Sequence, residues 1–148
     1  MAKKIKILFL CTGNSCRSQM AEGWARNLKG EEIEAFSAGV ETHGLNPLAV
    51  KVMAEAGIDI SHQYSKLADE LADVAFDAII TLCGHARENC PYFPGGGKFI
   101  HVDFDDPPRI ARELAEQGAH EEAQLGCYRR VRDEIKAFVE ALPESLEL

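Results

Sequence analysis

Four short apolar runs along the chain have the length and composition of β-strands. The run at residues 77–83 is continuous, as expected of a strand covered on both faces, whereas residues 33–37 alternate between small side chains and larger or charged ones. The predicted strands are Ile5–Leu10, Ile33–Ser37, Asp77–Cys83 and Phe99–Val102.

Apolar residues with helical spacing fill the segments between these runs. One helix is predicted directly after the first strand and another over residues 48–56. Residues 107–142 are mainly helical in pattern, with Gly118 and Gly126 as candidate interruptions. The second interruption would place Cys127 just before the last helix.

The alternation of strands and helices predicts an α/β fold, with a four-stranded parallel sheet flanked by helices on both faces. The 148 residues are 46% hydrophobic and 27% charged and contain no repeat or linker, so one domain over residues 1–148 is expected. The apolar runs are far shorter than the roughly 18 residues of a membrane span, which argues against a membrane protein. Lys6 interrupts the signal-like beginning, and a cytoplasmic location is therefore predicted.

The charge balance and the number of cysteines limit the partners and the cysteine chemistry that the chain can have. With 16 Lys and Arg against 24 Asp and Glu, the net charge of −8 argues against a nucleic-acid partner, so any bound anion must meet a local positive site. The five cysteines are an odd number in a chain expected in the cytoplasm, which argues against a disulfide framework. They are therefore candidates for buried thiols, metal ligands or redox groups.

A cluster of small and polar residues follows the first predicted strand and precedes the first predicted helix. A loop at this position can wrap backbone N–H groups around an oxyanion. Cys11 would lie beneath that anion as a thiolate nucleophile to which Ser18 donates, and Arg17 would grip two anion oxygens. The alternative is a core cysteine followed by an ordinary turn. The predicted anion-binding residues are Thr12, Gly13, Asn14, Ser15, Cys16, Arg17 and Ser18.

Further motifs accompany this loop along nearly the whole chain. Together they resemble the arsenate reductases built on the low-molecular-weight protein tyrosine phosphatase fold, with the clearest departure at residues 108–125. The resemblance implies a low-molecular-weight phosphatase-like fold for this chain. The matching segments are Cys11–Trp24, Ser37–Gly39, Thr42–Pro47, Gly57–Ser61, Thr81–Cys83, Asn89–Pro91, Phe104–Pro107 and Arg130–Ile135.

The resemblance also implies a reaction that uses three thiols. Cys11 would attack arsenate, and Cys83 would then attack Cys11, so that arsenite leaves with the electron pair. Cys90 would next attack Cys83, and thioredoxin would reduce the resulting disulfide. The segment between the last two cysteines must move, because a helix would hold their α-carbons about 10 Å apart, beyond the roughly 7 Å that a disulfide allows.

Two other functions remain open at this point. A low-molecular-weight tyrosine phosphatase would hydrolyse phosphomonoesters with Cys11 and Arg17 but would not require Cys83 or Cys90. A noncatalytic oxyanion-binding regulatory module would need the loop alone. The two later cysteines could also simply end a buried strand and occupy a loop, and their spacing does not match a zinc site, so no metal site is predicted.

The resemblance assigns the general acid to Asp106, which precedes Pro107 and would protonate the leaving oxygen. Asp105 is the neighbouring alternative. Asn14 and Ser18 would support the loop, and Glu22 and Ser37 would lie behind it.

Some relatives bind potassium through residues that match Asn14, Glu22 and Ser37, together with an Asp that follows a Ser. Here Ser65 is followed by Lys66, which departs from the pattern and argues against an ion site. The Lys66 ammonium is a candidate to take the place of the ion as a tethered charge, and a solvated surface lysine is the alternative. No tightly bound cofactor is predicted.

Overall fold

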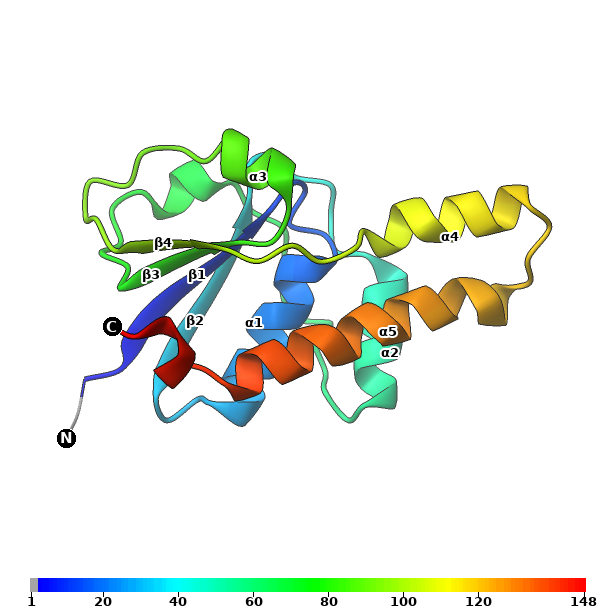
Figure 1. Ribbon diagram of the computed structural model, residues 1–148, viewed down its shortest axis with the longest axis horizontal. Helices are drawn as coiled ribbons and strands as arrows, with labels where there is room; N and C mark the ends of the chain where they lie inside the picture. The colour runs from blue at the N-terminus through cyan, green and yellow to red at the C-terminus, as the bar shows by residue number, and fades with distance from the viewer. Residues whose placement is uncertain (1–2) are drawn as a thin grey trace.

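The elements follow one another along the chain as strands alternating with helices, and the computed structural model describes residues 3–148 (Figure 1). The strands are β1 (Ile5–Cys11), β2 (Ile33–Gly39), β3 (Ala78–Thr81) and β4 (Lys98–His101). The α-helices are α1 (Arg17–Leu28), α2 (Pro47–Glu55), α3 (Gly84–Glu88), α4 (Pro107–Glu116) and α5 (Glu121–Glu140). Two short 3-10 helices are η1 (Ala68–Leu71) and η2 (Glu144–Leu146).

All neighbouring strands of the sheet run parallel, in the order β2-β1-β3-β4. Ile7 in β1 is paired with Ala35 on one side and with Ala78 on the other, which makes β1 a central strand. Parallel pairing brings the carboxyl ends of the strands to one edge, where α/β proteins bind their ligands. The predicted four-stranded parallel α/β fold is confirmed.

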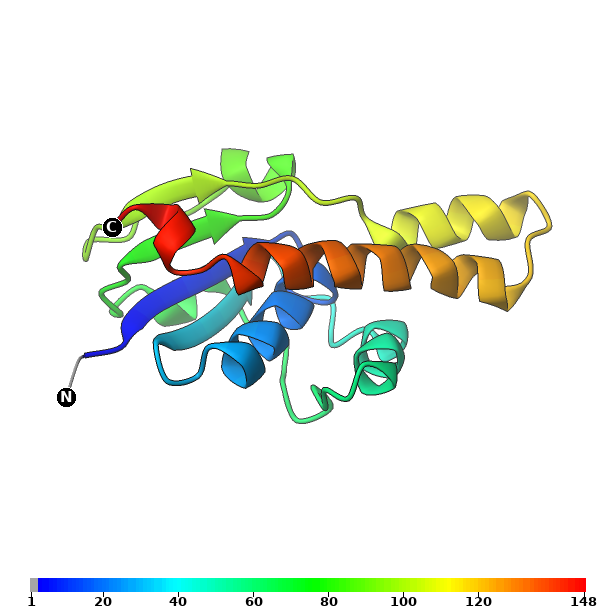
Figure 2. The same ribbon diagram turned by 60° about the horizontal axis from the view of Figure 1, so that its bottom comes forward.

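Helices cover both faces of the sheet. The long helices α1 and α5 lie together on one face, and η1 and α3 lie on the other (Figures 1 and 2). Continuous burial of Ile7 to Cys11 follows from this arrangement, because side chains on both sides of β1 meet helices or loops.

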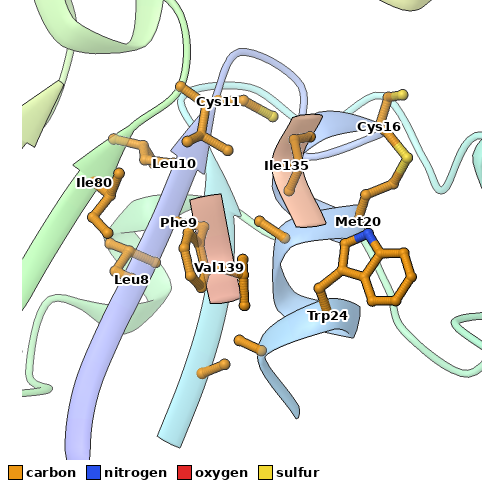
Figure 3. Packing of buried hydrophobic residues seen from close by; sticks show 14 of the residues in the cluster. Leu8, Phe9, Leu10, Cys11, Cys16, Met20, Trp24, Ile80, Ile135 and Val139 are labelled. Carbon is orange, nitrogen blue, oxygen red and sulfur yellow. The ribbon is translucent and has the colours of Figure 1, made fainter. Parts of the chain in front are cut away.

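The main core lies between β1, α1 and α5. Figure 3 shows Phe9 of the sheet, Met20 and Trp24 of α1 and Val139 of α5 around the same buried volume. The indole nitrogen of Trp24 donates to the carbonyl of Arg132 at 3.1 Å, so this hydrogen bond joins the two helices directly. The core thereby fixes the start of α1, which follows the predicted anion loop.

Helix α5 differs from the sequence prediction. Gly118, with φ +83°, does interrupt the helical region, but Gly126 lies inside α5 and does not. The prediction that Cys127 precedes the last helix is therefore wrong. Leu125 and Tyr128 flank this position and are buried, and burial of such side chains offsets the roughly 1 kcal/mol by which a helical glycine is less favourable than alanine.

Helix α4 and the first turns of α5 form a hairpin that extends past the sheet (Figures 1 and 2). It contains residues 108–125, the segment where the chain departs most clearly from the motif pattern. Only Pro107 and Ala111 of α4 are buried. None of the helices within residues 3–148 is long and apolar enough to cross a membrane.

Candidate active site

The predicted anion loop connects β1 to α1 at the carboxyl edge of the sheet, and its carbonyl groups are held by neighbouring segments. The side-chain amide of Gln19 donates to the carbonyl of Asn14 at 3.0 Å, and the Ser65 hydroxyl donates to that of Gly13 at 2.8 Å. Three backbone amides also donate to loop carbonyls: Glu41 to Thr12, His43 to Gly13 and Asn46 to Ser15. The loop carbonyls therefore point away from its centre.

The backbone amides of the same loop have the opposite orientation. Within the described part of the chain, no amide from Thr12 to Cys16 donates a hydrogen bond to a protein acceptor. Asn14 has a φ of +47°, in the left-handed region, and a Cβ on Gly13 would collide with the ring of His43. This backbone path leaves a set of convergent donors, which is the arrangement that binds a tetrahedral oxyanion.

Cys11 lies at the base of the loop and is almost fully buried. Its sulfur is 2.9 Å from the hydroxyl oxygen of Ser18, and that oxygen accepts a hydrogen bond from the Asn14 amide at 2.8 Å. Because Asn14 occupies the hydroxyl as an acceptor, the Ser18 proton is free to be donated to the sulfur. The arrangement places a hydrogen-bond donor against the Cys11 sulfur.

Arg17 faces the same pocket from the first turn of α1. Its guanidinium donates to the Phe104 carbonyl at 3.0 Å and lies 3.7 Å from a carboxylate oxygen of Asp106. Asp105 instead pairs with Arg130 at 2.7 Å. Of these two adjacent carboxyl groups, Asp106 is therefore the one that faces the loop.

The resulting pocket has a volume of about 370 Å³. The side chains that line it include Cys11, Arg17 and Asp106, and also His43 and Arg112. A tetrahedral oxyanion would occupy only part of this space, because pockets of this size accept whole small organic molecules.

Cys16 belongs to the loop but is buried in the core beside it. Burial raises the pKa of its thiol well above the ordinary value, and the neighbouring Cys11 raises it further. Cys16 therefore remains a protonated thiol at neutral pH, and Cys11 is the loop cysteine suited to nucleophilic attack.

The second predicted thiol lies against the residue that follows Cys11. The Cys83 sulfur is 3.2 Å from the hydroxyl oxygen of Thr12, the residue after Cys11, and it accepts from the Ala86 amide at 3.4 Å. Cys90 lies beyond α3, where it is half-buried and its thiol donates to the Pro91 carbonyl at 3.4 Å. Burial raises the pKa of Cys90.

Comparison with known proteins agrees with this geometry. Residues 6–148 match the family described as "Low molecular weight phosphotyrosine protein phosphatase". The chain belongs to this family. An "Arsenate reductase" of Bacillus subtilis (strain 168) is 53% identical over 135 residues, 91% of each chain. An "Arsenate reductase" of Halalkalibacterium halodurans is 48% identical over 145 residues, 98% of this chain and 99% of the relative.

A solved structure in the same family shares the fold. It is described as "An arsenate reductase in the phosphate binding state", is 36% identical and superposes with a TM-score of 0.74 over 93% of this chain and 95% of its own. The resemblance to arsenate reductases of the low-molecular-weight phosphatase fold, predicted from the motifs, is confirmed.

The residues that matched the predicted ion-site pattern surround the side chain of Lys66. The Lys66 ammonium donates to the Ser37 carbonyl at 2.9 Å and lies 4.0 Å from a Glu22 oxygen. The Ser37 hydroxyl donates to the same Glu22 oxygen at 2.6 Å, and the Lys66 amide donates to the Asn14 side chain at 2.9 Å. Burial lowers the pKa of Lys66, and the Glu22 carboxylate opposes that shift. Within residues 3–148, no group of three or more His, Cys, Asp or Glu side chains is arranged to hold a metal ion.

The tethered-charge hypothesis predicts that stability does not depend on potassium. Replacing potassium with a bulky organic cation at constant ionic strength should leave the melting temperature nearly unchanged, because the ammonium of Lys66 already lies beside Glu22. Lys66→Asp should create a potassium response, with Lys66→Met as the uncharged control. A strong potassium dependence of the unmodified protein, measured by thermal melting, would contradict the hypothesis.

Three residues that shape the site were not among the predicted site residues. Gln19 is fully buried and donates to both Asn14 and Tyr64 carbonyls. Ser65 holds the loop from a distant segment, and His43 lines the pocket. Gln19 and His43 lie within the matching segments Cys11–Trp24 and Thr42–Pro47, and this was the signal that could have found them.

Proposed function

We propose that this protein reduces arsenate to arsenite with Cys11, Cys83 and Cys90, and that thioredoxin regenerates it. One observation carries the proposal: Cys83 lies against Thr12, so a second thiol is held against the residue that follows the nucleophile. Hydrolysis of a phosphate ester needs one thiol, whereas reduction of arsenate needs two electrons and therefore two thiols in succession. The arsenate reductases that share about half of their residues with this chain support the same conclusion.

In the first step the Cys11 thiolate attacks the arsenic atom of arsenate, which the loop amides and Arg17 hold. A sulfur–arsenic bond forms and an arsenic–oxygen bond breaks. Asp106 gives its proton to the departing oxygen, which leaves as water. The position of Asp106 beside Arg17 supports this role, because both groups face the same pocket.

In the second step the Cys83 thiolate attacks the sulfur of Cys11. The sulfur–arsenic bond breaks, its electron pair stays with arsenic, and arsenite leaves as a Cys11–Cys83 disulfide forms. The Thr12 hydroxyl and the Ala86 amide both lie against the Cys83 sulfur and can donate hydrogen bonds to it.

In the third step Cys90 attacks Cys83, Cys11 departs as a thiolate, and a Cys83–Cys90 disulfide remains for thioredoxin. Helix α3 separates these residues and must unwind for their α-carbons to approach. Only Ala86 of α3 is buried, so unwinding exposes little apolar surface. Burial raises the pKa of Cys90 in the folded segment. When the segment moves, this burial is expected to end, and the thiolate form of Cys90 becomes more favourable.

The test is arsenate-dependent NADPH oxidation with thioredoxin and thioredoxin reductase, run beside a glutathione and glutaredoxin system. We expect multiple turnovers with thioredoxin and arsenite as the product. Reduction supported only by glutathione would overturn the choice of partner. Hydrolysis of an aryl phosphate without any arsenate reduction would favour a phosphatase, and binding of oxyanion without either reaction would favour a regulatory module.

A further inference from the structure

One arginine that lines the pocket has no role in the proposed reaction. Arg112 lies on α4, one turn after Pro108, and both residues line the pocket that contains Cys11. Residues four apart share a face of a helix. This face of α4 therefore overhangs the anion loop, and Figure 1 shows the beginning of α4 close to the beginning of α1.

Arg112 has no carboxylate partner within the described residues. Elsewhere in this acidic chain, arginines are mostly paired: Arg109 with Glu113, for example, and Arg130 with Asp105. With 24 acidic residues available, an arginine that faces a pocket and makes no ion pair is unusual. Its guanidinium is free to meet an anion from solution.

The other basic side chains that line the pocket each have a protein partner. Arg17 donates to the Phe104 carbonyl and faces Asp106, while the ring nitrogen Nε2 of His43 lies 2.7 Å from a Glu41 oxygen. Within residues 3–148, Arg112 is thus the pocket-lining cation that has no protein partner.

We infer that Arg112 is a second substrate-binding arginine, which captures the free inorganic oxyanion and favours it over an aryl ester. An oxyanion on the loop leaves the outer part of the pocket open, so the guanidinium of Arg112 can approach its outward oxygens. The ring of an aryl phosphate would fill that outer part and keep Arg112 away from the anion. This inference rests on the proposed function, because it takes the oxyanion on the loop as the substrate.

Arg112→Ala should weaken binding of inorganic phosphate or arsenate about threefold to tenfold, as expected for loss of one charge near the pocket mouth. We expect the loss in KM, with kcat for arsenate reduction nearly unchanged. The difference from wild type should shrink at high salt, since the screening length falls from about 10 Å at 0.1 M to about 3 Å at 1 M. Hydrolysis of an aryl phosphate should change by less than twofold.

Arg87→Ala is the matched control, because Arg87 is another exposed arginine without an ion pair within residues 3–148, and it does not line this pocket. Calorimetric titration with phosphate should give wild-type affinity for this control. Equal losses in both variants would show a general field effect and overturn the inference. Wild-type phosphate affinity in Arg112→Ala would also overturn the inference.

The same titration separates this inference from the proposed function. If the wild-type protein reduces arsenate and Arg112→Ala binds phosphate normally, Arg112 is not a binding residue and the proposed reaction is unaffected. If the wild-type protein binds phosphate through Arg112 but reduces no arsenate, the proposed reaction fails while the second binding arginine remains.

Discussion

Cys11→Ser is expected to abolish both arsenate reduction and aryl phosphate hydrolysis. Cys83→Ser and Cys90→Ser should abolish multiple-turnover reduction but leave hydrolysis intact. A serine hydroxyl stays protonated at neutral pH and is a much weaker nucleophile than a thiolate. The first step of either reaction therefore fails without Cys11. The two later thiols act after the arsenic adduct has formed. Hydrolysis, which needs neither of them, should stay within a few-fold of wild type.

Steady-state assays of both reactions and a mass measurement after one turnover would check this pattern. Cys90→Ser should stop as a Cys11–Cys83 disulfide, and Cys83→Ser should release no arsenite. Cys127→Ser is the matched control: it replaces a thiol inside α5 that hydrogen-bonds to the Gln124 carbonyl, and both reactions should continue. Full steady-state reduction by Cys83→Ser would rule out the relay.

Arg17→Ala is expected to remove most of the stabilisation that oxyanions give the folded protein. A ligand at a hundredfold excess over its dissociation constant stabilises the native state by about 2.7 kcal/mol. For a chain of this size that corresponds to roughly 5 to 10 °C in melting temperature. The Arg17 guanidinium faces the loop and is held by Phe104, so its loss removes the fixed positive charge in the pocket.

Melting curves with phosphate and with chloride at equal ionic strength would measure this effect. Arg17→Lys keeps the charge but cannot contact two oxygens at once, and an intermediate shift is expected for it. A phosphate-induced shift in Arg17→Ala as large as that of wild type would place the anion site elsewhere in the molecule.

The order of the fold followed from local patterns, but several of its boundaries did not, two of them at glycines. Strand β2 continues to Gly39, two residues past the predicted end, because the Gly39 amide donates to the Lys66 carbonyl and a Cβ there would collide with neighbouring backbone. Gly126 was predicted to break a helix that it continues. Both differences come from tertiary contacts, which override the preference of a single glycine.

In the site, too, residues that are close in sequence could be predicted, whereas contacts between distant segments could not. The residues from Cys11 to Ser18 are contiguous, so a motif could identify them. The Ser65 hydroxyl on the Gly13 carbonyl and the Thr12 hydroxyl on Cys83 join segments 52 and 71 residues apart, and no periodicity links such positions. Asp106 and Asp105 were also adjacent in sequence, and only the ion pair of Asp105 with Arg130 separates their surroundings.

The outward-held carbonyls of the anion loop connect the reactivity of this protein to its biosynthesis. The donors that hold them come from α1, from the segment after β2 and from Ser65. In a growing chain that does not yet contain Ser65, some of these hydrogen bonds cannot form. The loop amides are then not held in their convergent orientation. Cys11 would then be an ordinary thiol on a polypeptide leaving the ribosome, and its reactivity toward oxyanions and oxidants would arise only when the fold around it closes.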